Sequence, residues 1–262
     1  MSGPIVDGVD GIIRNAVEGR RSVDPSFEKL VVMLTTPGGY IEVVHRIVDT
    51  FRQHYDLVDF VVPDHAYSAG TVLVLSGDAI HMDYYSRLGP IDPQVESKEG
   101  RPVSALGYLE RYNELIQKAT DGRITAAEVQ LLISGFDQGE LYHYEQAREL
   151  SIALLKEWLV KYKFKNWDLT ETRKIPVTPE MRTDSAEKIA RELSNTRKWH
   201  VHGHGISREV LERDLNLRID DFGDLPPRGR IIRGYHALLT DYMVKLGKQG
   251  VVHTRAGFVP FM

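Results

Sequence analysis

Short apolar runs alternate with helical patterns over the first 95 residues, and no other feature limits the fold as strongly. The runs at 30–34, 57–62 and 79–82 have the length and composition of buried strands. Residues 40–55 repeat apolar side chains at helical spacing, whereas residues 71–79 fit either a helix or a strand. If the latter segment is a helix, strands and helices alternate, which predicts parallel β-α-β units.

Composition narrows the class of protein. Of the 262 residues, 42% are apolar and 27% are charged, as in ordinary globular proteins. The chain has no cysteine, which excludes disulfides and thiolate metal sites. Its formal charge of -4 argues against a nucleic-acid partner. We therefore expect a globular protein with no nucleic-acid partner, no cofactor and no metal.

The N-terminal sequence lacks the basic start and apolar run of a secretory signal. No window approaches the roughly 18 uninterrupted apolar residues of a membrane-spanning helix. These absences predict a soluble, cytoplasmic protein. The chain starts abruptly at Ser2–Ile5, where a further strand is expected. If a preceding segment is missing, membrane association through it is the expectation.

Beyond residue 104 the pattern becomes mostly helical. We expect helices at 108–119, 140–162, 184–194, 207–214 and 231–248. Prolines and glycine make 224–229 a predicted linker. The chain then divides into a domain at 1–223 and a C-terminal helix and tail at 224–262. The tail is rich in apolar residues, so this unit is expected either to serve homo-oligomerisation or to complete the core of the monomer.

Ser68 is the first candidate for chemistry. Its surroundings, Ala66-Tyr67-Ser68-Ala69-Gly70, approach the nucleophile-elbow pattern G-x-S-x-G, with alanine in place of the first glycine. Small neighbours permit a tight turn that places the hydroxyl at the start of a helix, where backbone N–H groups stabilise a developing oxyanion. A serine with a purely structural place in a turn is the alternative explanation.

The pair Gly38-Gly39 closes the first predicted strand. Glycines at such a position can present bare backbone N–H groups to a ligand. One helix and one strand separate the pair from Ser68, so a parallel sheet places both loops at the same edge. A tight strand-to-helix turn explains the glycines equally well.

Several segments together resemble the serine dehydrogenase proteinase family, which is grouped with signal peptide peptidase A and the Clp proteolytic subunit. The segments are TTPGGY at 35–40, AYSAGTVLVLSGDAIHMD at 66–83, LGPIDPQ at 88–94, and NTRKWHVHGHGI at 195–206. The order and spacing of these pieces are more specific than any one of them. The resemblance covers roughly residues 30–220.

This resemblance implies the Clp/crotonase fold, an α/β spiral of ββα units with a mainly parallel sheet and a helical C-terminal half. It implies that Ser68 is the nucleophile of a serine endopeptidase. The backbone N–H groups of Gly39, Gly38 and Ala69 are then expected to form the oxyanion hole. The resemblance also implies a peptide or protein substrate and a homo-oligomeric assembly.

The resemblance leaves the general base open. The Clp subunit carries a histidine shortly after its nucleophile, but residues 90–94 contain none. Signal peptide peptidase A uses a lysine farther along the chain, at a spacing that corresponds to Lys118. Leu115 and Ile116 precede this lysine, and an apolar wall would lower its pKa toward neutrality. An exposed helix lysine is the alternative.

His202 is the second candidate base. Family members tend to carry a histidine here, followed by an aspartate, but Gly203 takes that position in this chain. Histidine suits proton transfer near neutral pH. His200, His202 and His204 alternate as three metal ligands on a strand would. No acidic residue is close enough in sequence to orient them, so a surface histidine strip is the preferred interpretation.

Two other functions stay open. A crotonase-like enzyme acting on acyl thioesters would use the same paired loops, but it would need no serine at the elbow. The chain also has no clear basic pocket for a coenzyme A phosphate. A catalytically inactive scaffold or regulator fits the missing triad histidine, Ala66 and Gly203.

Overall fold

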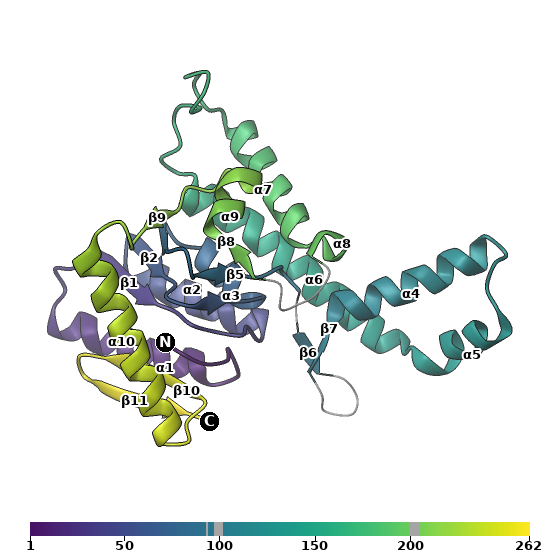
Figure 1. Cartoon of the computed structure of the whole chain (residues 1–262), viewed down its shortest axis with the longest axis horizontal. Coiled ribbons are helices and arrows are strands. Elements are labelled where there is room, and N and C mark those ends of the chain that lie inside the picture. Colours follow the sequence, from purple (N-terminus) through teal and green to yellow (C-terminus); the bar gives the residue numbers. More distant parts are fainter. Residues whose placement is uncertain (93, 97–101, 200–204) are drawn as a thin grey trace.

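The computed structural model describes residues 1–92, 94–96, 102–199 and 205–262. Its body is a sheet packed with helices, and an arm made of α4 and α5 extends away from it (Figure 1). Both ends of the chain lie near α1 and the C-terminal hairpin (Figure 1). The mixed α/β class that the sequence predicts is therefore confirmed.

The central sheet is parallel and has the strand order β1-β2-β4-β9. The register pairs Lys29 with Leu57 and Asp59 with Ala79. The first three strands are those predicted from the apolar runs. The four strands are β1 (Lys29–Met33), β2 (Leu57–Val61), β4 (Ala79–Met82) and β9 (Asp220–Asp221).

Three helices of the N-terminal half build the core: α1 (Val9–Val23), α2 (Ile41–His54) and α3 (Ala69–Leu75). The predicted apolar stripe of α2 is buried, as the helical spacing requires. Every residue of α3 is buried. A helix that is apolar on all sides has no helical periodicity, which explains why residues 71–79 were ambiguous in sequence.

A second, three-stranded sheet brings distant segments to the start of α3. In it β3 (His65–Ala66) pairs with β5 (Arg87–Leu88) in parallel, and β5 pairs with β8 (Ile206–Ser207) in the antiparallel sense. A hairpin of β6 (Gln94–Glu96) and β7 (Pro102–Ser104) follows. Ser68 therefore lies in the short turn between β3 and α3.

The helical half forms the arm and one side of the body (Figure 1). Its elements are α4 (Ala105–Thr120), α5 (Ala126–Gly135), α6 (Gln138–Trp158), the π-helix η1 (Leu159–Lys163), α7 (Pro179–Leu193), α8 (Thr196–Trp199) and α9 (Arg208–Leu215). A small separate core joins α4 to α6, made of Ala105, Leu109, Leu141, Tyr144 and Ala147. Within the described ranges, no helix is both long and apolar enough to cross a membrane.

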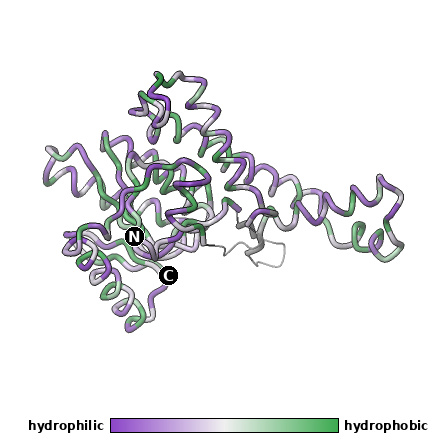
Figure 2. The backbone as a smooth tube through the Cα atoms, turned by 45° about the horizontal axis from the view of Figure 1, so that its top comes forward, coloured by the Kyte–Doolittle hydropathy of each residue, from purple (hydrophilic) through white to green (hydrophobic). Residues whose placement is uncertain are grey.

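Helix α5 was not predicted, because none of its residues is buried. Thr125 and Glu128 form a capping box at its start, which stabilises this short helix locally. Its apolar side chains Leu131 and Ile133 are exposed at the tip of the arm, where Figure 2 shows hydrophobic residues.

The C-terminal unit consists of α10 (Pro226–Lys245) and a hairpin of β10 (Gly250–Thr254) and β11 (Gly257–Phe261). The linker expected at 224–229 is wrong in part, because α10 already begins at Pro226. Proline is favoured in the first turn of a helix, where its missing N–H costs nothing. The buried Val251 of β10 pairs with Ser2 at the other end of the chain. The domain boundary at 223 stays a prediction.

Candidate active site

Ser68 has a backbone conformation that non-glycine residues rarely adopt. Its φ is 53° and its ψ is -121°, and it is the N-cap of α3. Such a conformation costs about 1–3 kcal/mol and persists only where the surrounding structure enforces it. A nucleophile elbow has a strained turn residue of this kind at the start of a helix.

The loop after β1 lies directly against Ser68. A Cβ atom added to Gly38 would lie 2.9 Å from the Ser68 Cβ and 3.4 Å from its Oγ. The φ of Gly38 is +106°, so this position favours glycine on both counts. The structure thus brings the Gly38-Gly39 loop and the Ser68 elbow into contact.

Thr36 joins these two loops, and the sequence analysis did not single it out. Its N–H donates to the His65 carbonyl at 2.9 Å, and its carbonyl accepts from the Tyr67 N–H at 3.0 Å. Its Oγ1 accepts from the Gly38 N–H at 3.0 Å. These three hydrogen bonds fix the glycine loop against the residues that lead into Ser68.

Two backbone N–H groups beside Ser68 have no acceptor among the described residues. They belong to Gly39 and Ala69, one on each loop. The Gly38 N–H, by contrast, is occupied by Thr36. Most buried N–H groups are paired, so a pair of free donors on two touching loops is unusual. Gly39 and Ala69 are therefore better placed than Gly38 to receive an oxyanion.

Residues 89–92 cover the Ser68 hydroxyl, and we call this segment the strap. Ser68 Oγ donates to the Asp92 carbonyl at 2.6 Å, and Ser68 is fully buried. The Gly89 N–H donates to the Ala66 carbonyl and the Ile91 N–H to the Leu193 carbonyl. The strap is thus held by hydrogen bonds to two other segments, and its last residue accepts the hydrogen bond of the Ser68 hydroxyl.

Asp92 also connects the strap to α4, because its buried carboxylate accepts from the Leu106 N–H at 3.0 Å. Lys118 lies twelve residues beyond Leu106 on the same helix, about 18 Å away at the helical rise. Its ammonium contacts Glu128 at 2.6 Å. This contact lowers the pKa of Glu128 to about 2, with help from Thr125.

Lys118 therefore does not contact Ser68 in this arrangement, and its role as base stays a prediction. His202, the other candidate, lies outside the described residues together with His200 and His204. The described residues contain no cluster of three or more histidine or acidic side chains that could hold a metal. His65 pairs with Asp64 at 3.2 Å and stacks on Tyr67 beside the elbow.

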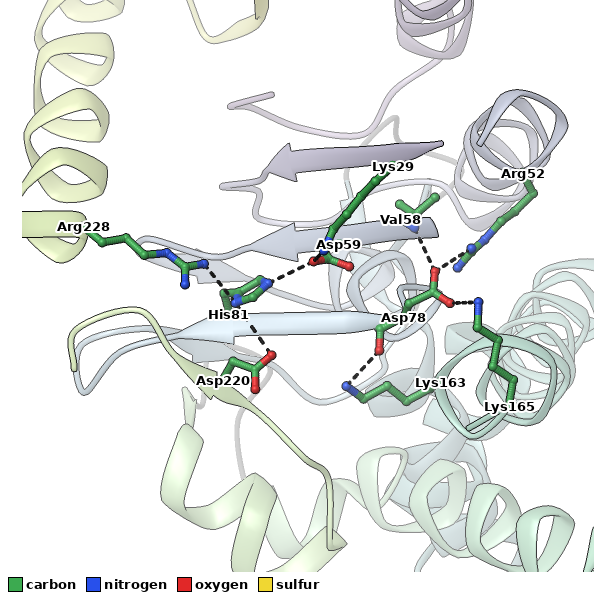
Figure 3. A network of polar contacts seen from close by, with 10 residues as sticks. All are labelled: Lys29, Arg52, Val58, Asp59, Asp78, His81, Lys163, Lys165, Asp220 and Arg228. Carbon is green, nitrogen blue, oxygen red and sulfur yellow. Dashed lines mark hydrogen bonds and ion pairs between the residues drawn. The ribbon is translucent and has the colours of Figure 1, made fainter. Parts of the chain in front are cut away.

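A separate charged network lies on the sheet (Figure 3). Asp59 is buried, contacts Lys29 and lies 3.2 Å from Nε2 of His81. An Arg228 guanidinium nitrogen from α10 lies 3.2 Å from the other ring nitrogen of His81. His81 is buried in this network. The network ties α10 to the sheet and takes no part in the Ser68 loops.

A second group of charges meets at the start of β4 (Figure 3). The Asp78 carboxylate contacts Arg52 at 2.7 Å and also pairs with Lys165. Lys163 donates to the backbone carbonyls of Arg218 at 2.9 Å and Asp78 at 3.5 Å. Asp78 comes before β4, whereas the Ser68 loops follow the carboxyl ends of β1 and β2. This edge of the sheet is therefore the one opposite the candidate active site.

Because of Lys163, the free energy of unfolding is expected to change with pH in the alkaline range. Burial lowers its pKa from 10.5 to about 8, despite the opposing effect of Asp220. Between these values the unfolded chain binds more protons than the folded protein, so stability rises with pH and the penalty is complete below pH 8. We would measure the free energy of unfolding in urea from pH 7.5 to 10.5 for wild type and for Lys163→Met. Over this range the wild-type value should rise by up to about 2 kcal/mol relative to that of the variant. The partial exposure of Lys163 keeps the expected change below the full value of the pKa shift. A constant difference between the two proteins would contradict this expectation.

Comparison with known proteins finds a family that matches part of the chain. Residues 15–129 match the ClpP-like SDH-type serine proteinase family. Two curated relatives come from Methanocaldococcus jannaschii, the uncharacterized proteins MJ0137 (34% identical over 71 residues) and MJ1495 (26% over 98 residues). The matches cover 27% and 37% of this chain, but only 25% and 32% of those relatives.

Two solved structures are also similar in part. Both are variants of the 1510-N membrane-bound stomatin-specific protease, one of them in complex with a substrate peptide. They are 14% and 15% identical and cover 84% of this chain, and the chain covers 76% and 72% of them. The TM-scores are 0.47 and 0.48. The family match alone confirms the resemblance drawn from the motifs: residues 15–129, which include Gly38, Gly39 and Ser68, match the ClpP-like SDH-type serine proteinase family.

Proposed function

We propose that the chain is a serine peptidase in which Ser68 attacks the carbonyl of a peptide bond. The observation that carries the proposal is the strained elbow of Ser68 packed against the Gly38-Gly39 loop. In the first step Ser68 Oγ bonds to the carbonyl carbon and loses its proton to a base. The bond to the leaving amine then breaks, the amine takes the proton, and an acyl-enzyme remains for water to hydrolyse.

The oxyanion formed in the first step needs hydrogen-bond donors that are already in place. The N–H groups of Gly39 and Ala69 have no acceptor within the described part of the chain and lie on the two loops that meet at Ser68. Loss of one such donor typically costs about 10²–10³ in kcat. The start of α3 adds little, because this helix has only seven residues.

The base must displace the Asp92 carbonyl, because a backbone carbonyl cannot accept the proton. For a dyad like that of signal peptide peptidase A, Lys118 must lose its pair with Glu128 and become neutral near Ser68. For a histidine base, His202 must approach the same atom. Both mechanisms require the strap to move before the reaction begins.

Covalent labelling tests this proposal. The purified protein would be treated with a fluorophosphonate probe, and the modified peptide mapped by mass spectrometry in wild type, Ser68→Ala, Lys118→Ala and His202→Ala. We expect labelling at Ser68 that is lost in Ser68→Ala and in one of the two base variants. Labelling elsewhere, or none in a folded protein, would contradict an activated Ser68. The latter result would favour a catalytically inactive scaffold.

A further inference from the structure

A groove of about 850 Å³ lies between α4, α6 and α7. Its apolar lining comes from Leu106, Leu109 and Ile152, and its α4 wall continues to Lys118. The wall from Leu106 to Lys118 is about 18 Å long at the helical rise. That length accommodates about five residues of extended chain at 3.3 Å each.

One end of the groove lies two hydrogen bonds from the candidate nucleophile. Leu106 lines the groove, and its N–H donates to the Asp92 carboxylate. The carbonyl of the same Asp92 accepts from Ser68 Oγ. On the opposite wall, Ser194 follows Leu193, whose carbonyl holds the strap through Ile91. The groove therefore leads to the strap from one side.

Three charged side chains of the groove have partners on their own helices. Glu114 pairs with Arg111 on α4 at 3.0 Å, Arg148 pairs with Glu149 on α6 at 2.7 Å, and Arg191 pairs with Glu187 on α7 at 3.0 Å. None of these three pairs crosses the groove.

The groove also holds a polar atom that lacks a partner. The Ser194 hydroxyl is shielded from water, and no described residue hydrogen-bonds to it. A buried hydroxyl without a partner costs free energy that a ligand can recover. The groove thus offers an unused hydrogen-bonding group in addition to acidic and basic walls and an apolar lining.

We propose that this groove binds an extended, unfolded segment of polypeptide on one side of the bond presented to Ser68. The assignment rests on the proposed peptidase function and names its substrate class. An extended backbone presents N–H and C=O groups along its length, one of which can pair with the Ser194 hydroxyl, and the α4 wall has room for about five of its residues. A small anion is disfavoured because Arg148 and Arg191 already have carboxylate partners.

Binding of a permanently unfolded chain tests the assignment. The probe is fluorescein-labelled α-lactalbumin, reduced and carboxymethylated, and its native form is the control ligand. Fluorescence anisotropy would be measured with Ser68→Ala protein, which leaves the probe intact. In this background Asn113→Trp fills the groove from α4, while Ala119→Trp adds the same side chain on the same helix outside the groove lining.

We expect the unfolded probe to bind and the native control not to bind. Asn113→Trp should weaken binding at least about tenfold, and Ala119→Trp should leave it unchanged. Equal affinity of the two tryptophan variants, or no binding to the Ser68→Ala protein, would overturn the assignment. Fluorophosphonate labelling of wild type separates the two proposals. If Ser68 is labelled but the two tryptophan variants bind the probe equally well, only the groove assignment is wrong. If Ser68 is not labelled but Asn113→Trp weakens binding of the probe, only the peptidase proposal is wrong.

Discussion

Replacement of Ser68 by alanine is expected to reduce the hydrolysis of fluorescein-labelled casein at least about a thousandfold. The variant lacks the only atom that forms the acyl-enzyme in the proposed mechanism. The fold should persist, because the change removes one hydrogen bond to the Asp92 carbonyl, worth about 1 kcal/mol. Initial rates and urea unfolding, measured on the same preparation, check both parts.

Ser76→Ala is the matched control for this experiment. Ser76 is also buried, lies at the other end of α3, and donates to the Leu73 carbonyl at 2.6 Å. Its replacement should cost about the same stability and leave the hydrolysis rate within about twofold. If Ser68→Ala keeps more activity than Ser76→Ala, Ser68 is not the nucleophile and the proposed mechanism fails.

Replacement of Gly39 by alanine is expected to lower the free energy of unfolding by about 3 kcal/mol or more. A Cβ at this position would lie 1.9 Å from the carbonyl oxygen of Ile5, and the φ of Gly39 is +148°. The added methyl group must therefore displace the segment that pairs with the glycine loop. Urea denaturation would measure the loss, and fluorophosphonate labelling of Ser68 should fall with it.

Gly19→Ala is the control, because the same substitution is expected to raise the free energy of unfolding at this position. Gly19 is exposed in the middle of α1, and a Cβ there meets nothing within 4 Å. Alanine should raise stability by about 0.5–1 kcal/mol, as expected in a helix. A Gly39→Ala protein as stable as wild type would show that the Ile5 segment yields easily, and the rigid support inferred for the glycine loop would be lost.

The central architecture could be predicted because its strands and α2 obey simple periodicities. The three apolar runs became β1, β2 and β4, and the predicted parallel pairing follows from their order. Helix α5 and the β10–β11 hairpin were missed for a physical reason. The helix buries no side chain. Neither strand of the hairpin alternates buried and exposed residues, since β10 starts with three buried residues and ends with two exposed ones.

Part of the candidate site could also be predicted from the sequence, and part could not. The order of the predicted strands places Ser68 and Gly38 at one edge of the sheet, and the structure brings them together. The partner of the Ser68 hydroxyl is a main-chain carbonyl, which no side-chain pattern can reveal. The position of Lys118 depends on how far α4 extends from the body, and helical periodicity does not encode that direction. For Thr36, the sequence signal was the pair of threonines directly before Pro37.

Asp92 couples the arm to the candidate site through two hydrogen bonds. Its carboxylate accepts from the Leu106 N–H at the start of α4, and its carbonyl accepts from Ser68 Oγ. Leu109 and Tyr144 in the small core hold this end of α4 against α6. A change in the position of α4 is therefore expected to reach the Ser68 hydroxyl through a single residue.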